Sequence, residues 1–222
     1  MKPGLSTVAL LAGVFIPFIA TADDYSYNNA TENRDAFGVR AGIEITSTSG
    51  DDDNYSNGAG GSVGAVYTKY LYRDFYIEPG AYLFYDTFGQ NITAISEPAD
   101  VPVEVDGSIR NFGFRVPVNV GYRLSLTDDM GLKFFTGPQM NVSLVARSHF
   151  NDEEGVEKID DESILGKKGF KRFDLQWNFG VGLDYNRWFV GITASAGVSK
   201  VMNRTYERFR RNYVMVAVGY TF

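Results

Sequence analysis

One group of residues has the types and the spacing that hydrolytic chemistry could use. Ser148 and His149 are followed by Asp152, and a hydroxyl, an imidazole and a carboxylate are the components of a hydrolase or acyltransferase triad. Closeness in sequence does not make a triad, and no nucleophile-elbow signature accompanies these residues. The pattern therefore favours an ordinary strand end over a catalytic centre.

A second group could hold a metal ion. Asp51-Asp52-Asp53-Asn54 offers the oxygen ligands that calcium prefers. An EF-hand loop also needs an oxygen ligand at its fifth position and Gly at its sixth, where this chain has Tyr55 and Ser56. Cys is absent and His occurs once, which excludes thiolate metal sites and disulfides. We expect a solvated acidic loop here, and no catalytic, cofactor-binding or metal site in the chain.

Two further segments concentrate charge. Residues 152–162 hold seven acidic side chains and precede Lys167, Lys168, Lys171 and Arg172; such a run is usually solvated, although it could bridge to a protein partner. Residues 200–211 are basic and could lie near the phosphate groups of outer-leaflet lipopolysaccharide. Their cations are Lys200, Arg204, Arg208, Arg210 and Arg211, against Glu207. The net charge of −6 argues against nucleic acid as a partner.

The start of the chain has the features of an export signal. Residues 1–22 combine Lys2, an apolar run and the small-residue site Ala20-Thr21-Ala22, which together predict a cleavable signal peptide. Residues 23–35 are polar and predict a periplasmic lead-in. The mean hydropathy of −0.17 leaves no later window apolar enough for a membrane-spanning helix, so residues 36–222 would enter a bilayer only as strands.

From residue 36 onward, eight segments alternate between apolar and polar residues with the period of a β-strand. In the segment from Phe173 to Tyr185, every odd-numbered residue is apolar and every even-numbered residue is Asp, Gln, Asn or Gly. The segments at 61–71 and 75–87 are less regular, because Lys69 falls on the apolar face and Tyr76, Tyr82 and Phe84 fall on the other. The remaining segments lie at 37–45, 112–125, 132–144, 190–198 and 213–222.

The apolar faces hold too many large side chains to fit inside an eight-stranded barrel, so we expect them to face lipid. The other faces combine many glycines with ten charged residues, five of each sign, whose mutual pairing predicts a filled lumen. These residues are Arg40, Glu44, Glu78, Asp86, Arg115, Arg123, Lys133, Arg147, Asp174 and Asp184. Aromatic residues near the strand ends predict an interfacial girdle; they are Phe75, Tyr122, Tyr185, Trp188, Tyr220 and Phe222.

The lengths of the connections support the same architecture. Three short connections, at 72–74, 127–129 and 186–187, alternate with four long ones, at 47–58, 88–107, 148–172 and 200–211. Short periplasmic turns and longer outside loops are typical of outer-membrane barrels. The sequence therefore predicts an all-β fold: a closed, eight-stranded, antiparallel, up-and-down transmembrane β-barrel.

Four residues fit this barrel less well. Pro79, Pro117 and Pro138 each remove a hydrogen-bond donor from a proposed strand, and we expect a β-bulge at each. Lys69 lies two residues from a predicted turn, so its amine can extend to the membrane interface.

Several short strand motifs resemble a known family. They are Gly38-Val39-Arg40-Ala41-Gly42, Val116-Pro117-Val118-Asn119-Val120-Gly121-Tyr122-Arg123, Gly137-Pro138, Phe179-Gly180-Val181-Gly182-Leu183-Asp184-Tyr185 and Gly219-Tyr220-Thr221-Phe222. These resemble PorT-like outer-membrane β-barrels of Bacteroidetes-type bacteria, which are related to OmpX-like and OmpA-like barrels. The resemblance implies a Gram-negative outer-membrane location and insertion by the barrel-assembly machinery, which reads the terminal strand at 213–222. Some PorT-like proteins are linked to secretion of surface proteins.

We therefore expect a monomeric, non-enzymatic outer-membrane barrel whose outside loops contact lipid, lipopolysaccharide, a ligand or an envelope protein. Three alternatives stay open: a narrow passive channel, a membrane enzyme that uses His149, and a soluble lipocalin-like barrel with its apolar faces turned inward.

Overall fold

The computed structural model describes residues 35–50, 55–96, 101–150, 162–166, 171–201 and 209–222. Residues 33–222 form one compact unit. The predicted signal peptide at 1–22 and nearly all of the lead-in at 23–35 lie outside the described residues. No helix within the described ranges is long and apolar enough to cross a membrane.

Eight long strands and two short ones make up the described part of the chain. The long strands are β1 (Ala36–Gly50), β3 (Gly58–Tyr72), β4 (Phe75–Ser96), β5 (Val101–Ser125), β6 (Met130–Phe150), β8 (Phe173–Tyr185), β9 (Trp188–Gly197) and β10 (Phe209–Thr221). The short strands are β2 (Tyr55–Ser56), which pairs with β4, and β7 (Glu162–Ser163), which pairs with β6.

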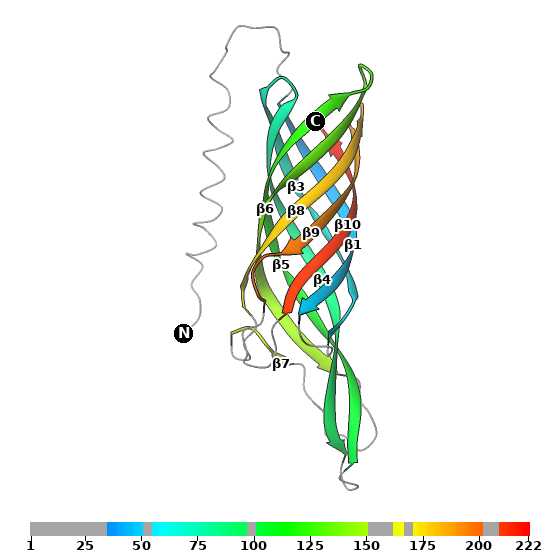
Figure 1. Cartoon of the computed structure of the whole chain (residues 1–222), viewed down its shortest axis with the longest axis vertical. Coiled ribbons are helices and arrows are strands. Elements are labelled where there is room, and N and C mark those ends of the chain that lie inside the picture. Colours follow the sequence, from blue (N-terminus) through cyan, green and yellow to red (C-terminus); the bar gives the residue numbers. More distant parts are fainter. Residues whose placement is uncertain (1–34, 51–54, 97–100, 151–161, 167–170, 202–208) are drawn as a thin grey trace. The chain divides into compact units, whose positions relative to one another are not determined.

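The long strands close into a barrel (Figure 1). Each pairs antiparallel with the long strand that follows it in the chain, and β10 returns to β1, from Gly38 opposite Thr221 to Gly50 opposite Phe209. Closure leaves neither β1 nor β10 as a free edge. The predicted eight-stranded, antiparallel, up-and-down barrel is confirmed.

The two faces of the wall have the composition that the alternation predicts. Large apolar side chains such as Ile43, Val190 and Phe179 are exposed on the outer surface, while polar and charged residues such as Glu44, Gln176 and Asp174 are buried inside. A soluble barrel of the lipocalin type would have the opposite arrangement. The outward direction of the apolar faces therefore contradicts that alternative.

All three short connections lie at one end of the barrel. Residues 73–74 and 186–187 form two-residue turns, and Arg73 and Asn186 each adopt a φ of 52°. A positive φ suits the primed turns that match the twist of paired strands. The aromatic residues predicted for a girdle gather near this end. Their ring centroids lie 4.9 Å apart for Phe75–Tyr122, 5.3 Å for Trp188–Tyr220 and 5.4 Å for Tyr220–Phe222.

One predicted loop is a β-hairpin. The segment at 88–107 is predicted as a long connection between strands, but β4 and β5 stay paired from Gln90 opposite Gly107 to Ser96 opposite Val101. β2 accompanies β4 only to Gln90, and β6 accompanies β5 only to Gly107. The paired ends of β4 and β5 therefore extend beyond the other strands as a two-stranded arm (Figure 1).

The expected bulges at the three prolines are wrong. The register continues unchanged through Pro79, Pro117 and Pro138, although pairing with at least one neighbouring strand is interrupted at or beside each of them. A short interruption accommodates the missing donor without an extra residue. The register shifts elsewhere: between Tyr70 and Tyr72 on β3, and at Leu144, which has no partner between Phe112 and Gly113.

Lys69 lies on the outer face close to the turn at 73–74, as expected. Its amine is 3.8 Å from the carboxylate of Asp35, which also accepts a hydrogen bond of 2.9 Å from the backbone N–H of Tyr70. The ion pair joins the residue before β1 to the end of β3.

Glycines on the inner face make room for large side chains on neighbouring strands. A Cβ on Gly121 would overlap the ring of Tyr76, one on Gly180 the ring of Phe135, and one on Gly182 the ring of Phe189. These three rings form a buried cluster toward the end with the short turns. The glycine-rich inner face therefore accommodates a layer of aromatic side chains.

Gly180→Ala tests this packing. Because the added methyl group meets the ring of Phe135, we expect a loss of about 1–3 kcal/mol in the free energy of unfolding. The measurement is urea unfolding of the barrel in lipid vesicles, followed by the fast-migrating band of unheated samples on gels. Ala194→Val on the outer face is the control, and F135L should restore part of the stability. A G180A barrel as stable as the original would contradict the packing.

Candidate functional site

The lumen contains the densest group of charged side chains in the described residues, and Arg115 on β5 is at its centre. Its guanidinium forms a bidentate ion pair with Glu44 on β1 and lies 3.4 Å from a carboxylate oxygen of Asp86 on β4. The rings of Phe84 and Tyr213 each have their centroid 4.4 Å from the Arg115 guanidinium carbon. Carboxylates thus neutralise the edge of the guanidinium, while aromatic rings cover its faces.

Arg211 extends this network, although the sequence placed it in an outside loop. Its guanidinium donates hydrogen bonds of 3.0 Å to Asp86 and 3.2 Å to Asp174. β10 begins at Phe209, four residues earlier than expected, so Arg211 lies on the same face as the inward-facing Tyr213. The loop prediction for Arg211 is wrong because the strand continues past the point where its alternation becomes polar.

Arg147 was predicted in the lumen and lies outside it. The unpaired Leu144 shifts the alternation of β6, so that Ala146 and Ser148 face inward and Arg147 is exposed on the outer face. Arg211 takes its place in the charge balance. The described lumen still pairs five cations with five carboxylates, but one of the predicted cations is exchanged.

A second network lies nearer the short turns. Arg40 donates two hydrogen bonds of 2.7 Å to Glu78, which also accepts one of 2.8 Å from Thr68, and the Arg40 guanidinium carbon lies 3.8 Å from the ring centroid of Phe189. In the next layer, Asp184 is 3.0 Å from the amine of Lys133 and 3.7 Å from Arg123. Ion pairs therefore cross the lumen at several levels along the barrel.

Neutral polar groups complete the network around Asp174. Its carboxylate accepts hydrogen bonds of 3.1 Å from Asn141, 2.9 Å from Gln176 and 2.9 Å from Ser199. A buried charge is tolerated when its remaining lone pairs are also satisfied. The amides on β6 and β8 therefore hold the carboxylate that pairs with Arg211.

An apolar layer lies at the lumen end away from the short turns. It comprises Phe88, Ile109 and Ala146 from three adjacent strands, together with Ile164 and Val201 from connecting segments. Phe88 and Ile109 share the inward alternation of Asp86 and Asn111, so the layer follows directly on the Arg211 network. Sequence reasoning missed it, because Ile164 and Val201 lie in segments predicted to be outside loops and not strands.

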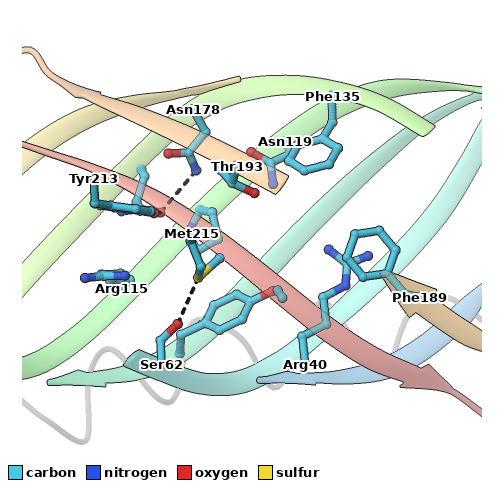
Figure 2. A pocket seen from close by; sticks show the side chains of 14 residues that line it. Arg40, Ser62, Arg115, Asn119, Phe135, Asn178, Phe189, Thr193, Tyr213 and Met215 are labelled. Carbon is cyan, nitrogen blue, oxygen red and sulfur yellow. Dashed lines mark hydrogen bonds between the residues drawn. The ribbon is translucent and has the colours of Figure 1, made fainter. Parts of the chain in front are cut away.

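Between the two charge networks lies one small cavity of about 30 Å³. Figure 2 shows Arg115 toward one end of it and Arg40, beside Phe189, toward the other. Within the described residues, Asn119 and Asn178 each have a buried side-chain oxygen without a hydrogen-bond partner, and both line the cavity. Its volume suits one or two water molecules, whereas drug-sized ligands occupy roughly 300–1,000 Å³.

The structure separates the residues of the hydrolase-like pattern. Ser148 is buried on the inner face of β6 and His149 is exposed on the outer face, as neighbours in a strand must be. Asp152 and the acidic run at 51–54 lie outside the described residues. Within the described part of the chain, no group of His, Asp and Glu residues has the arrangement of a metal site.

A closed barrel with an apolar outer wall and an ion-paired lumen defines a class of protein, the membrane-spanning β-barrels. The chain belongs to the family described as the outer membrane protein beta-barrel domain, whose model matches residues 25–203. It is an outer-membrane protein. The exposed apolar side chains of the wall are therefore its lipid-facing surface.

Solved structures of outer-membrane barrels are similar to the chain. Ail, the attachment invasion locus protein of Yersinia pestis, solved in complex with the heparin analogue sucrose octasulfate, is 13% identical, with 85% of this chain and 99% of that chain covered and a TM-score of 0.40. Neisserial surface protein A is 12% identical, with 84% and 97% covered and a TM-score of 0.45. No curated protein matches the chain.

Arg115→Gln tests how far the barrel depends on the paired lumen. The substitution leaves the buried carboxylate of Glu44 without its bidentate partner, so we expect a loss of about 3–5 kcal/mol in the free energy of unfolding. Urea unfolding in lipid vesicles measures it, with the exposed R187Q, expected to change stability by less than about 0.5 kcal/mol, as the control.

The double variant R115Q/E44Q should cost less than the sum of the two single variants, because two neutral amides can bond to each other. Equal losses in R115Q and R187Q would show that the ion pair contributes nothing to stability.

Proposed function

We propose that the protein is a non-enzymatic outer-membrane barrel that acts through its external segments and not through its lumen. The observation that carries this proposal is the filled lumen, where paired charges and aromatic rings occupy successive layers. A barrel filled in this way serves as a rigid support for the segments at its rim.

A passive channel is the second candidate, and the filled lumen argues against it. An ion would have to pass the Lys133–Asp184 layer, the Arg40–Glu78 layer, the Arg115 network and the apolar layer in turn. The cavity between the charge networks has a volume of about 30 Å³. Conduction would require several buried ion pairs to separate together, each at a cost of several kcal/mol.

The membrane-enzyme candidate also loses support. Its sequence argument rested on His149 beside Ser148, and the two side chains lie on opposite faces of β6. The Ser148 hydroxyl is buried among inward-facing residues, away from an imidazole that could activate it.

The arm formed by the ends of β4 and β5 is the largest described element outside the barrel wall, and we assign the surface contacts to it and its neighbouring loops. Residues 91–106 contain four acidic side chains, Glu97, Asp100, Glu104 and Asp106, and no Lys or Arg. An envelope protein with a basic contact surface fits this charge. A link to secretion, as in some PorT-like proteins, stays a prediction that rests on the strand motifs.

Export and assembly form part of the same proposal. We infer cleavage after Ala22, a periplasmic lead-in at 23–35, and insertion by the barrel-assembly machinery through the terminal strand ending at Phe222. The short turns would then face the periplasm and the arm the outside, with the protein monomeric in the membrane.

Planar-bilayer recording tests the sealed lumen. The purified, refolded barrel should insert and produce no steady conductance steps, because paired charges block each layer of the lumen. Insertion is verified by the fast-migrating band of unheated samples. Steady single-channel steps from the original chain would favour the channel and overturn the proposal.

Cysteine labelling tests the orientation, and the absence of native Cys makes every introduced thiol unique. Thr93→Cys in the arm should react with a membrane-impermeant maleimide on intact cells. Asp128→Cys, in the turn at 126–129, should react only after the outer membrane is permeabilised. The reverse pattern of labelling would place the arm in the periplasm and remove it as a surface-contact element.

A further inference from the structure

Two arginines stand directly opposite each other on the outer face of the barrel. Arg110 on β5 and Arg147 on β6 are register partners, and both side chains are exposed. Directly opposed residues in an antiparallel pair have Cβ atoms about 4.5–5.5 Å apart, and like charges at that separation destabilise the sheet. An anion that contacts both guanidinium groups would offset this repulsion.

The neighbouring positions in the same row supply no carboxylate. Thr87 on β4 is opposite Arg110, and Ser163 on β7 is opposite Arg147. The hydroxyl of Thr87 is already bonded to the backbone of Ala59, donating to its carbonyl over 2.9 Å. Neither arginine forms a salt bridge with any of the described residues, whereas Arg40, Arg115 and Arg211 in the lumen each form at least one.

The position of the two arginines relative to the lipid-facing surface indicates which kind of anion can reach them. The adjacent outward-facing pair on the same two strands, Phe112 opposite Val145, is exposed and apolar. Two residues along a strand span about 6.6 Å, so the Arg110–Arg147 pair lies about that far from the apolar Phe112–Val145 pair, at the edge of the apolar surface. They lie at the rim away from the short turns, at the level of lipid headgroups.

We propose that Arg110 and Arg147 together bind a phosphate group of a lipid headgroup in the outer leaflet. Guanidinium groups present planar pairs of N–H donors that match phosphate oxygens, and a phosphate between them offsets their mutual repulsion. The aromatic ring of Phe112 and the side chain of Val145 contact the acyl part of the same lipid. The site rests on the outer-membrane location and the outward direction of the arm, and is independent of whether the lumen conducts.

The unpaired Leu144 is what creates the site. Without that extra residue, Arg147 would point inward, as the alternation of the β6 residues before Leu144 predicts. Arg110 would then have no cation opposite it on β6. Arg210 on β10 is also exposed, but its register partner is Ser49, so no second arginine stands opposite it on β1.

The test is lipid retention by the purified, full barrel in native mass spectrometry. The barrel is reconstituted in nanodiscs that contain either lipid A or lipid A from which both phosphates have been removed. We expect the original barrel to retain phosphorylated lipid A, and R110Q/R147Q to retain it about tenfold less, since charge-assisted hydrogen bonds are lost. R110K/R147K keeps the charge without the planar donors and should give an intermediate value.

The control is R73Q/R187Q, which removes the same two charges from turns at the opposite rim and should retain lipid as the original does. Migration of unheated samples verifies the folding of each variant; if the double variant does not fold, R110Q and R147Q are tested singly, each with an intermediate loss expected. Equal retention by R110Q/R147Q and R73Q/R187Q would overturn the site. Equal retention of phosphorylated and dephosphorylated lipid would overturn it as well, because a phosphate would not be the ligand. Either result leaves the conductance test of the sealed lumen unaffected.

Discussion

The low dielectric of a narrow barrel interior is the constraint on which the rest of this structure depends. Eight strands leave an interior that side chains can fill, and lipid outside requires the polar residues to face inward. A charge in that space is tolerated only beside an opposite charge with its other hydrogen bonds satisfied. Arg115 has opposite charges beside it in Glu44 and Asp86, and Arg40 has one in Glu78, while the Nε of Arg115 and one oxygen of Asp86 form no hydrogen bond within the described residues. The balance of five cations and five carboxylates follows from this requirement.

Aromatic rings and glycines solve the remaining problem, which is space. A guanidinium has two flat faces that form no hydrogen bonds, and in this lumen rings cover them: Phe84 and Tyr213 for Arg115, and Phe189 for Arg40. These rings in turn need wall positions without side chains, which Gly182 provides beside Phe189 and Gly113 beside Phe84. Charge, ring and glycine therefore form one packing unit that repeats along the barrel.

Much of this arrangement could be predicted from the sequence, because a strand in a closed barrel has two distinct faces and alternation reveals which residues share one. The strand from Phe173 to Tyr185 shows this directly.

The features that could not be predicted depend on single residues whose effect the alternation does not reveal. The unpaired Leu144 moves Arg147 outside, and the early start of β10 moves Arg211 inside. The bulges expected at the prolines are absent, because an interrupted ladder accommodates Pro79, Pro117 and Pro138 without an extra residue. The mutual pairing of the lumen charges could be predicted from their balance, whereas the apolar layer at Ile164 and Val201 depends on how two connecting segments fold.

The pairing of Arg211 has a consequence for how the barrel is assembled. Asp86 on β4 and Asp174 on β8 both form an ion pair with Arg211 on the last strand, 125 and 37 residues away along the chain. Until β10 pairs with β1, both carboxylates lie in a partly formed sheet without Arg211. In lipid, each carboxylate that lacks its partner raises the free energy of that sheet. The final strand thus closes the hydrogen-bonded wall and completes the electrostatics in one event. A barrel without β10 is correspondingly less stable in the bilayer, because Asp86 and Asp174 both lose their ion pair with Arg211.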